Sequence, residues 1–172
     1  VDLIELCKER QMEVYACAHK DRGPGRSLVE DFRVIDIKDI KGVEKFAKEK
    51  EVDYIFTLAS EVGVKTMAVA SENLGLPHFI SSEAAKILSD KAKWRTHLAG
   101  IEGNLSFMTG KKSDDFRDWN QYPAVLKPVD GSGQRGVYLV EDFPDIKKCF
   151  DKSIRFSRSK ELILEEMALG PE

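Results

Sequence analysis

The sequence is poor in the residues that build disulfide frameworks and metal sites. It has 3 cysteines and 3 histidines in 172 residues. Cys7, Cys17 and Cys149 are odd in number, far apart and set in apolar surroundings. This pattern is typical of reduced cysteines in a core and argues against a disulfide-bonded secreted protein. The histidines show no metal-ligand spacing. We therefore expect a cytoplasmic protein without a zinc site.

The sequence also lacks an excess of charge of one sign and any long apolar run. The formal net charge is −3, and charges of both signs are interspersed along the chain. Such a pattern gives no electrostatic footprint for nucleic acid or an anionic membrane surface. No apolar stretch is long enough for a membrane span, and none has the form of a signal peptide. A small molecule is therefore the expected partner.

The first half of the chain alternates helix and strand patterns. Helices are expected at residues 1–10, 39–50 and 64–74, and strands at residues 13–18, 33–37, 54–58 and 78–80. Gly75 and Pro77 follow the third helix and should end it. Such alternation predicts an α/β domain around a parallel sheet over residues 1–80. Because the sequence opens with a helix, we expect the strand that normally starts such a sheet to be missing.

The second half, residues 81–172, has a different pattern. Ser89 and Asp90 form a capped helix start, and the helix should run through His97 and end at Gly100. Asp142 should cap another helix, with Pro144 in its first turn and a buried stripe that includes Ile146, Cys149 and Phe150. A strand is expected at residues 161–167.

Between these helices lies a glycine-rich loop. Gly131, Gly133 and Gly136 form the pattern G-x-G-x-x-G, which by itself is a weak signal. A dinucleotide-binding loop must lead into a helix, whereas residues 137–140 are β-branched, aromatic and apolar. In a protein kinase the lysine follows the loop, whereas Lys127 precedes it here. We expect a strand, a loop that closes over a polyphosphate, and a second strand. An ordinary glycine-rich hairpin is the alternative.

Two lysines are candidate phosphate ligands. Lys127 shares one face of the incoming strand with Val125 and Val129, where a cation could hold a phosphate. Lys91 shares a helix face with Trp94 and Leu98. It could be aimed at a bound anion, or its stem could lie along an apolar surface with the charge in water. Spacing alone leaves both interpretations of Lys91 open.

Taken together, four segments resemble the ATP-grasp superfamily of ATP-dependent carboxylate ligases. Residues 52–57 with 72–77 resemble the domain that precedes the ATP-grasp fold, and residues 89–94 resemble the family's Asp-Lys helix. Residues 122–140 resemble its lysine strand and glycine loop, and residues 162–172 its adenine-side strand. The resemblance implies a Rossmann-like α/β domain at residues 1–80, followed at 81–172 by the first part of an ATP-grasp α+β domain. It is closest to the carbamoyl-phosphate-synthetase-like, biotin-carboxylase-like and amino-acid-ligase branches.

The resemblance also implies roles for individual residues. Lys91 and Lys127 would contact ATP phosphates, and the loop from Ser132 to Gly136 would form a mobile lid over them. Glu165 and the backbone of the residues after it would meet the adenine, Met167 would pack on the ring, and the last glutamate would bind the ribose. The complete set of implied ATP-binding residues is Lys91, Lys127, Ser132, Gly133, Gln134, Arg135, Gly136, Glu165, Glu166, Met167, Ala168 and Glu172. No metal ligand is assigned, because the family's Mg²⁺ ligands would lie beyond residue 172.

The implied reaction is transfer of the ATP γ-phosphoryl group to a carboxylate or bicarbonate. An amine or another nucleophile would then attack the acyl phosphate. We expect ATP, Mg²⁺ and a small carboxylate as partners, a homodimer as in the family, and no turnover by these 172 residues alone. Two alternatives stay open: a non-catalytic ATP-binding or subunit-docking module, and a nicotinamide-binding Rossmann oxidoreductase.

Overall fold

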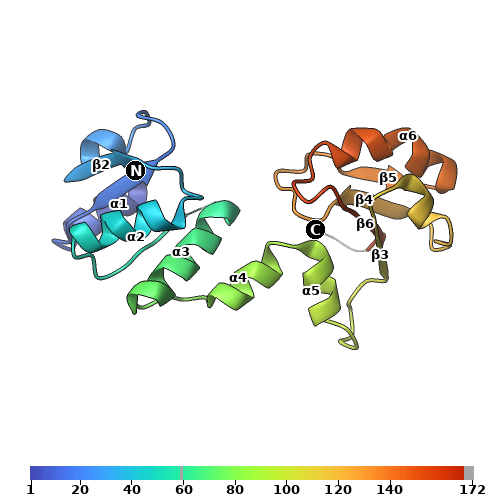
Figure 1. Cartoon of the computed structure of the whole chain (residues 1–172), viewed down its shortest axis with the longest axis horizontal. Coiled ribbons are helices and arrows are strands. Elements are labelled where there is room, and N and C mark those ends of the chain that lie inside the picture. The colour runs from blue at the N-terminus through green and yellow to red at the C-terminus, as the bar shows by residue number, and fades with distance from the viewer. Residues whose placement is uncertain (59, 169–172) are drawn as a thin grey trace. The chain divides into compact units, whose positions relative to one another are not determined.

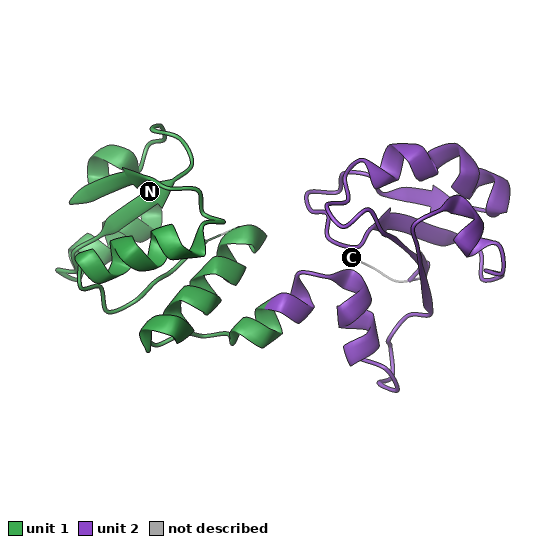
Figure 2. Cartoon of the chain, in the orientation of Figure 1, with its two compact units in different colours: residues 1–85 green, residues 86–172 purple. Residues whose placement is uncertain are grey.

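The chain forms two compact units, each with its own sheet. The computed structural model describes residues 1–58 and 60–168. Unit 1 comprises residues 1–85 and unit 2 residues 86–172 (Figure 2). The boundary falls within the helix α4 (Ser82–Leu88), which therefore contributes residues to both units.

Unit 1 is a small parallel sheet with helices. The strands β1 (Tyr15–Ala18) and β2 (Asp31–Val34) pair in parallel, as predicted for this half. The helices are α1 (Asp2–Glu9), α2 (Ile40–Glu49) and α3 (Glu61–Leu74), with a 3-10 turn η1 (Arg26–Leu28) ahead of β2. Gly75 follows α3 with φ +67°, in the left-handed region that glycine adopts readily. The predicted end of this helix is confirmed.

Two predicted strands of unit 1 are wrong. Residues 78–80 contain bends, and residues 54–57 are not part of any ladder formed by described residues. Residues 54–57 line a cavity of about 190 Å³, together with Tyr15 and Cys17 of β1 and with residues of α2 and α3. An apolar alternating segment becomes a strand only when a neighbouring strand lies within hydrogen-bonding distance. Here residues of β1 and residues 54–57 line the same cavity, and no ladder joins them.

Unit 2 contains a four-stranded antiparallel sheet in the order β3-β6-β4-β5 (Figure 1). Its strands are β3 (Phe107–Gly110), β4 (Ala124–Pro128), β5 (Tyr138–Val140) and β6 (Leu162–Glu166). Its other elements are α5 (Lys91–His97), a 3-10 turn η2 (Ser113–Phe116) and α6 (Phe143–Ile154).

One face of this sheet forms the core of unit 2. Leu126 of β4 and Leu162 and Leu164 of β6 are fully buried on this face. The predicted stripe of α6 packs against them through Ile146, Cys149 and Phe150, among others. The Asp142 carboxylate accepts a hydrogen bond from the Asp145 N–H at 2.8 Å and caps α6 as predicted.

The other face of the sheet carries charged side chains. Successive residues of a strand point to opposite faces, so Val125 and Lys127 of β4 share a face with Ile163 and Glu165 of β6. In the ladder Val125 lies opposite Glu165, and Lys127 lies opposite Ile163. A lysine and a glutamate are thus diagonal neighbours on the face that is turned away from α6.

Candidate functional site

Lys127 lies beside a buried carboxylate on this second face. Its Nζ atom is 2.5 Å from Oε2 of Glu165. The Lys127 side chain is 21% exposed, whereas that of Glu165 is only 3% exposed. The lysine head is therefore at the boundary between the sheet and solvent.

The glycine loop connects β4 to β5, which confirms the predicted order of strand, loop and strand. The dinucleotide-binding alternative required a helix after the glycines, and a strand follows instead. Gly136 has φ +74°, and a Cβ there would lie 2.9 Å from Cδ2 of Phe156 and 3.1 Å from the Ser153 carbonyl oxygen. A side chain at this position would therefore be both strained and crowded. The Ser153 hydroxyl also donates to the Gly136 carbonyl at 2.6 Å.

Asp130 fixes the start of this loop. Its carboxylate accepts hydrogen bonds from the Ser157 hydroxyl at 3.0 Å and from the N–H groups of Arg158 and Ser159 at 3.0 and 2.8 Å. Burial raises the pKa of the Asp130 carboxyl, but these hydrogen bonds outweigh burial and hold the pKa below its ordinary value. Gly133, Gln134 and Arg135 at the tip are exposed, whereas Ser132 is half-buried. The loop thus has a fixed base and an exposed tip.

The helix α5 begins directly against the loop. The Asp90 carboxylate caps it by accepting from the N–H groups of Ala92 and Lys93 at 3.0 and 3.1 Å. The Lys91 N–H donates to the Val129 carbonyl at 2.9 Å, and its Nζ donates to the Gly131 carbonyl at 2.8 Å. Lys91 therefore holds the glycine loop with both its backbone and its side chain. The ammonium group of Lys91 thus contacts a backbone carbonyl of the loop, and its contact with a bound anion stays a prediction.

The inner face of α5 differs from the predicted one. Trp94 is 37% exposed, whereas Lys91, Arg95 and Leu98 are half-buried. The expected face of Lys91, Trp94 and Leu98 is therefore rotated toward Arg95. The reason is an ion pair: the Arg95 guanidinium contacts the Glu165 carboxylate on the sheet, and this contact turns the Arg95 side of the helix inward.

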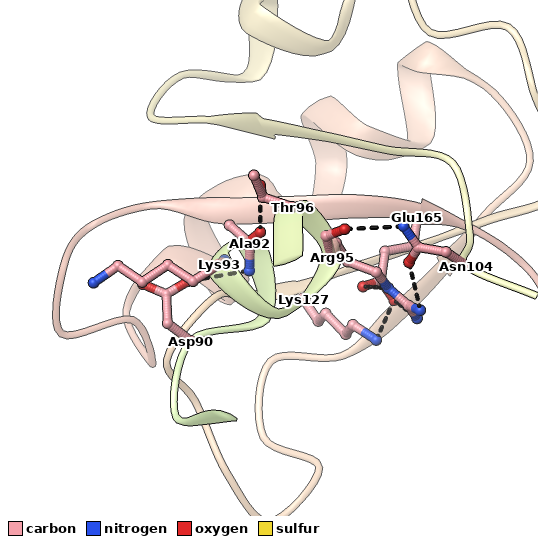
Figure 3. A network of polar contacts seen from close by, with 8 residues as sticks. All are labelled: Asp90, Ala92, Lys93, Arg95, Thr96, Asn104, Lys127 and Glu165. Atoms are coloured by element: carbon pink, nitrogen blue, oxygen red, sulfur yellow. Dashed lines mark hydrogen bonds and ion pairs between the residues drawn. The ribbon is translucent and has the colours of Figure 1, made fainter. Parts of the chain in front are cut away.

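Arg95 completes a network around Glu165 (Figure 3). Its Nε donates to Oε1 of Glu165 at 2.9 Å and its Nη2 to Oε2 at 3.4 Å. Its Nη1 donates to Oδ1 of Asn104 at 3.4 Å, and Nδ2 of Asn104 donates to the Arg95 carbonyl at 2.9 Å. Burial raises the pKa of the Glu165 carboxyl, but hydrogen bonds from Arg95 and Lys127 outweigh burial and lower it. Glu165 is therefore ionised at neutral pH.

Arg95, Asn104 and Asp130 also belong to this site, although they were not predicted from the sequence. Arg95 lies four residues after Lys91, a spacing that places both cations on the same face of a helix. That spacing was the available signal for Arg95. Asn104 and Asp130 act through contacts with residues that the sequence does not bring near them, so no local pattern marked them.

The adenine-side residues follow β6. The Glu166 N–H donates to the Ser106 carbonyl at 3.1 Å, and the Met167 N–H donates to the Pro123 carbonyl at 3.2 Å. The side chains of Met167 and Ala168 are exposed. Glu172, the expected ribose ligand, lies outside the described residues. Unit 2 thus contains Lys91, Lys127, the glycine loop and residues 165–168, and the structure joins them as two contacts, Lys91 to Gly131 and Lys127 to Glu165.

Two absences hold for the described residues, 1–58 and 60–168. Within these ranges no group of three or more histidine, cysteine, aspartate or glutamate side chains is placed to hold a metal ion. No helix in the described ranges has both the length and the apolar character needed to cross a membrane.

Two curated proteins are similar to the chain in sequence. A formate-dependent phosphoribosylglycinamide formyltransferase from Vibrio parahaemolyticus is 24% identical over 84% of this chain. A phosphoribosylamine–glycine ligase from Methanococcoides burtonii is 25% identical over 95% of it. The chain spans 38% and 39% of the length of these relatives. No family model matches the chain.

Solved structures show the same fold. An L-amino acid ligase from Bacillus licheniformis matches 99% of this chain with a TM-score of 0.78 at 21% identity, over 42% of its own length. An N5-carboxyaminoimidazole synthetase from Staphylococcus aureus, complexed with ADP, matches 96% with a TM-score of 0.75 at 18% identity, over 44% of its own length. These likenesses show that the chain has part of the fold of these ligases, and together with the two curated relatives they support the resemblance to the ATP-grasp superfamily found in the sequence.

Proposed function

We propose that this chain is the ATP-binding part of a ligase that activates a carboxylate or bicarbonate as an acyl phosphate for attack by an amine or other nucleophile. The names of the two curated relatives support the substrate class, because formate and glycine are both carboxylates. The ADP bound to a structural neighbour supports the nucleotide.

The observation that carries this proposal is the attachment of two lysines to one glycine loop and its strand. Lys127 lies on the strand that enters the loop, and Lys91 is bonded to the loop from α5. A triphosphate carries several negative charges, which lysine ammonium groups and backbone N–H groups bind well. The fixed base at Asp130 and the exposed tip at residues 133–135 suit a lid whose tip closes over phosphates while its base stays in place.

In this proposal each expected residue has one role. Lys91 and Lys127 contact the phosphates, and Ser132 to Gly136 form the lid. Glu165 and the backbone of Glu166 to Ala168 bound the adenine site, with Met167 exposed and able to cover the ring. Positioning and charge neutralisation are the contributions that such residues make to phosphoryl transfer.

Phosphoryl transfer by this superfamily also uses Mg²⁺, which offsets charge between the phosphates. The chain spans only 38% and 39% of the length of its two curated relatives. We therefore propose that the 172-residue chain binds ATP but does not turn it over. Phosphate release on addition of a carboxylate to the purified chain would contradict this second statement.

The binding test is calorimetry with ATP, using matched lysine variants. We expect Lys127→Ala and Lys91→Ala each to weaken binding on the order of tenfold, because each removes a charge-assisted contact. Lys93→Ala is the control: it lies on the same helix, and its side chain extends away from the network in Figure 3. Binding of NADH that survives Lys127→Ala, without binding of ATP, would overturn the proposal in favour of an oxidoreductase.

The alternative function, a non-catalytic ATP-binding module, makes a different prediction only for the activity of the whole protein. It too predicts ATP binding, but it predicts no phosphate release when Mg²⁺ and a range of carboxylates and amines are supplied to the parent protein. A homodimer stays a prediction, which size-exclusion chromatography coupled to light scattering tests.

A further inference from the structure

The Glu165 carboxylate carries one negative charge but contacts two positively charged side chains. The carboxylate is buried, and the two cations are Lys127 from β4 and Arg95 from α5. One cation is enough to compensate one buried carboxylate, so the cluster carries one surplus positive charge. A surplus charge beside the glycine loop attracts an anion.

The two cations are held differently. Arg95 approaches both carboxylate oxygens, and its guanidinium and carbonyl are also bonded to Asn104. Lys127 makes one contact from a flexible stem, and its side chain is the more exposed, at 21% against 16% for Arg95. Arg95 is therefore built as the permanent partner of Glu165, and Lys127 as the exchangeable one.

We propose that Arg95 is a positioning residue that allows Lys127 to leave Glu165 for a phosphate. This inference rests on the proposed function, because it takes ATP as the anion. When Lys127 turns to the phosphates, Glu165 would become an uncompensated buried charge unless another cation stayed beside it. Arg95 stays, and so the carboxylate remains ionised and in place while Lys127 changes partner.

The neighbours of Glu165 on each packed element show which group can titrate. On β4 these are Val125, in register with Glu165, and Lys127; on β3 the residue in register is Phe107. On α5 it is Arg95. If Arg95 is absent, Glu165 must bind a proton when Lys127 leaves, so ATP binding becomes coupled to proton uptake.

The test is calorimetry of ATP binding in buffers with different ionisation enthalpies, which counts the protons bound. Relative to the wild-type chain, we expect Arg95→Met to take up close to one extra proton. Its dissociation constant should then rise about tenfold for each pH unit above neutral, as required when binding takes up one proton. Arg95→Lys should restore the wild-type proton count, because it keeps a cation at this position.

Two further variants separate this role from a merely structural one. Glu165→Gln in the Arg95→Met background should abolish the extra proton uptake, because no carboxylate is left to protonate. Arg117→Met removes an arginine that contacts Asp114 and Phe143, neither of which belongs to this network, and it should change neither the affinity nor the proton count. Loss of ATP affinity in Arg95→Met without extra proton uptake would overturn the proposal.

If Arg95→Met does not fold, the wild-type chain still provides a test. NMR titration of a ¹³C-labelled Glu165 carboxyl should show it ionised at neutral pH both without ATP and at saturation. Protonation of Glu165 at neutral pH on ATP binding would overturn the role of Arg95. Failure of the wild-type chain to bind ATP would instead overturn the proposed function, and the two failures are therefore distinguishable.

Discussion

The two units differ in how completely they bury their own sheets. In unit 2 the central strand β6 has a neighbour on each side, and Leu162, Ile163 and Leu164 are fully buried. In unit 1 the sheet formed by described residues has two strands, and β1 borders a cavity on its other side. Large apolar side chains are exposed in both units, among them Tyr54, Phe56 and Leu58 in unit 1 and Leu139 and Phe156 in unit 2, so the difference lies in the strands at the centre of each sheet.

This difference shows where a preorganised site can be built. Groups that bind phosphate need fixed positions, and unit 2 supplies them from a sheet closed by α6 and from a loop anchored at Asp130. The backbone of β1 shows the contrast. The Val14 and Ala18 carbonyls accept from the Glu30 and Ile35 N–H groups beside β2, so the alternating backbone groups of Tyr15 and Cys17 point away from β2. Hydrogen exchange should therefore be faster in unit 1 than in β6.

The largest expected effect comes from comparing two arginine–glutamate ion pairs, one in each unit. Arg95–Glu165 in unit 2 is buried, whereas Arg33–Glu49 in unit 1 is a bidentate pair on the surface. Glu165→Gln should lower the free energy of unfolding by about 3–5 kcal/mol, because Arg95 and Lys127 lose their buried counter-charge. Glu49→Gln should cause no resolvable change, because solvent screens the exposed pair.

The readout for this pair of variants is urea unfolding. Trp94 and Trp119, the two tryptophans of the chain, both lie in unit 2, so their fluorescence follows unit 2 alone. Hydrogen exchange of α2 and α3 follows unit 1. Equal destabilisation by the two variants would mean that the burial of Glu165 has no energetic consequence.

The second prediction makes the same substitution in the two units. Leu126 on β4 is fully buried, whereas Leu58 in unit 1 is 60% exposed. Leu126→Ala should cost about 2–5 kcal/mol, from lost apolar burial and the cavity it leaves. Leu58→Ala should change stability by less than about 0.5 kcal/mol. A cost for Leu58→Ala comparable with that of Leu126→Ala would show that the apolar face of unit 1 is covered in solution.

These contrasts also show what the sequence could predict. Helix ends were predictable because their signals are local: Asp90 and Asp142 cap the helices that follow them, and Gly75 ends α3. The order of strand, loop and strand around the glycines was also predictable, because the residues on either side have clear strand patterns.

Non-local contacts were not predictable. Residues 54–58 have the composition of a strand, but pairing depends on a neighbour that no local pattern reveals. Arg95 and Glu165 are 70 residues apart, so their contact exists only after α5 and β6 have packed. Consequently the two lysines were predicted as members of the candidate site, whereas Arg95, which shares the Glu165 carboxylate with Lys127, was not.

The third prediction compares two glycines with similar backbone angles. Gly136 in unit 2 has φ +74° and close neighbours, whereas Gly75 in unit 1 has φ +67° and open space around its would-be Cβ. Gly75→Ala should cost about 1 kcal/mol, from the left-handed backbone alone. Gly136→Ala should cost more, about 2–3 kcal/mol, because its Cβ would also meet Phe156 and the Ser153 carbonyl. Thermal unfolding of both variants measures the difference, and equal costs would indicate that the loop relaxes freely around Gly136.

The smallest expected effect is a difference in acid sensitivity. The pKa values of Glu165 and Asp130 in unit 2 are lowered, because hydrogen bonds outweigh the burial that raises them. A lowered folded-state pKa gives stability that is fully present above the ordinary carboxyl value of about 4 and is lost as the pH falls below it. In unit 1 the pKa of Glu49 is lowered by its hydrogen bond from Arg33, and that of Asp31 by its hydrogen bond from Lys50.

Salt should separate these two contributions, because it screens exposed charges far more than buried ones. A salt concentration of about 0.5 M is roughly three times the physiological ionic strength. At this concentration the stability of unit 1 should lose most of its dependence on pH, whereas the stability of unit 2 should keep it. Asp130→Asn tests the assignment: it should lower the stability of unit 2 at pH 7 by about 1 kcal/mol and flatten its decline below pH 4. Tryptophan-monitored unfolding between pH 3 and 7 measures both changes. A decline that is unchanged in Asp130→Asn and disappears in salt would mean that surface charges, and not the anchored loop, make unit 2 sensitive to acid.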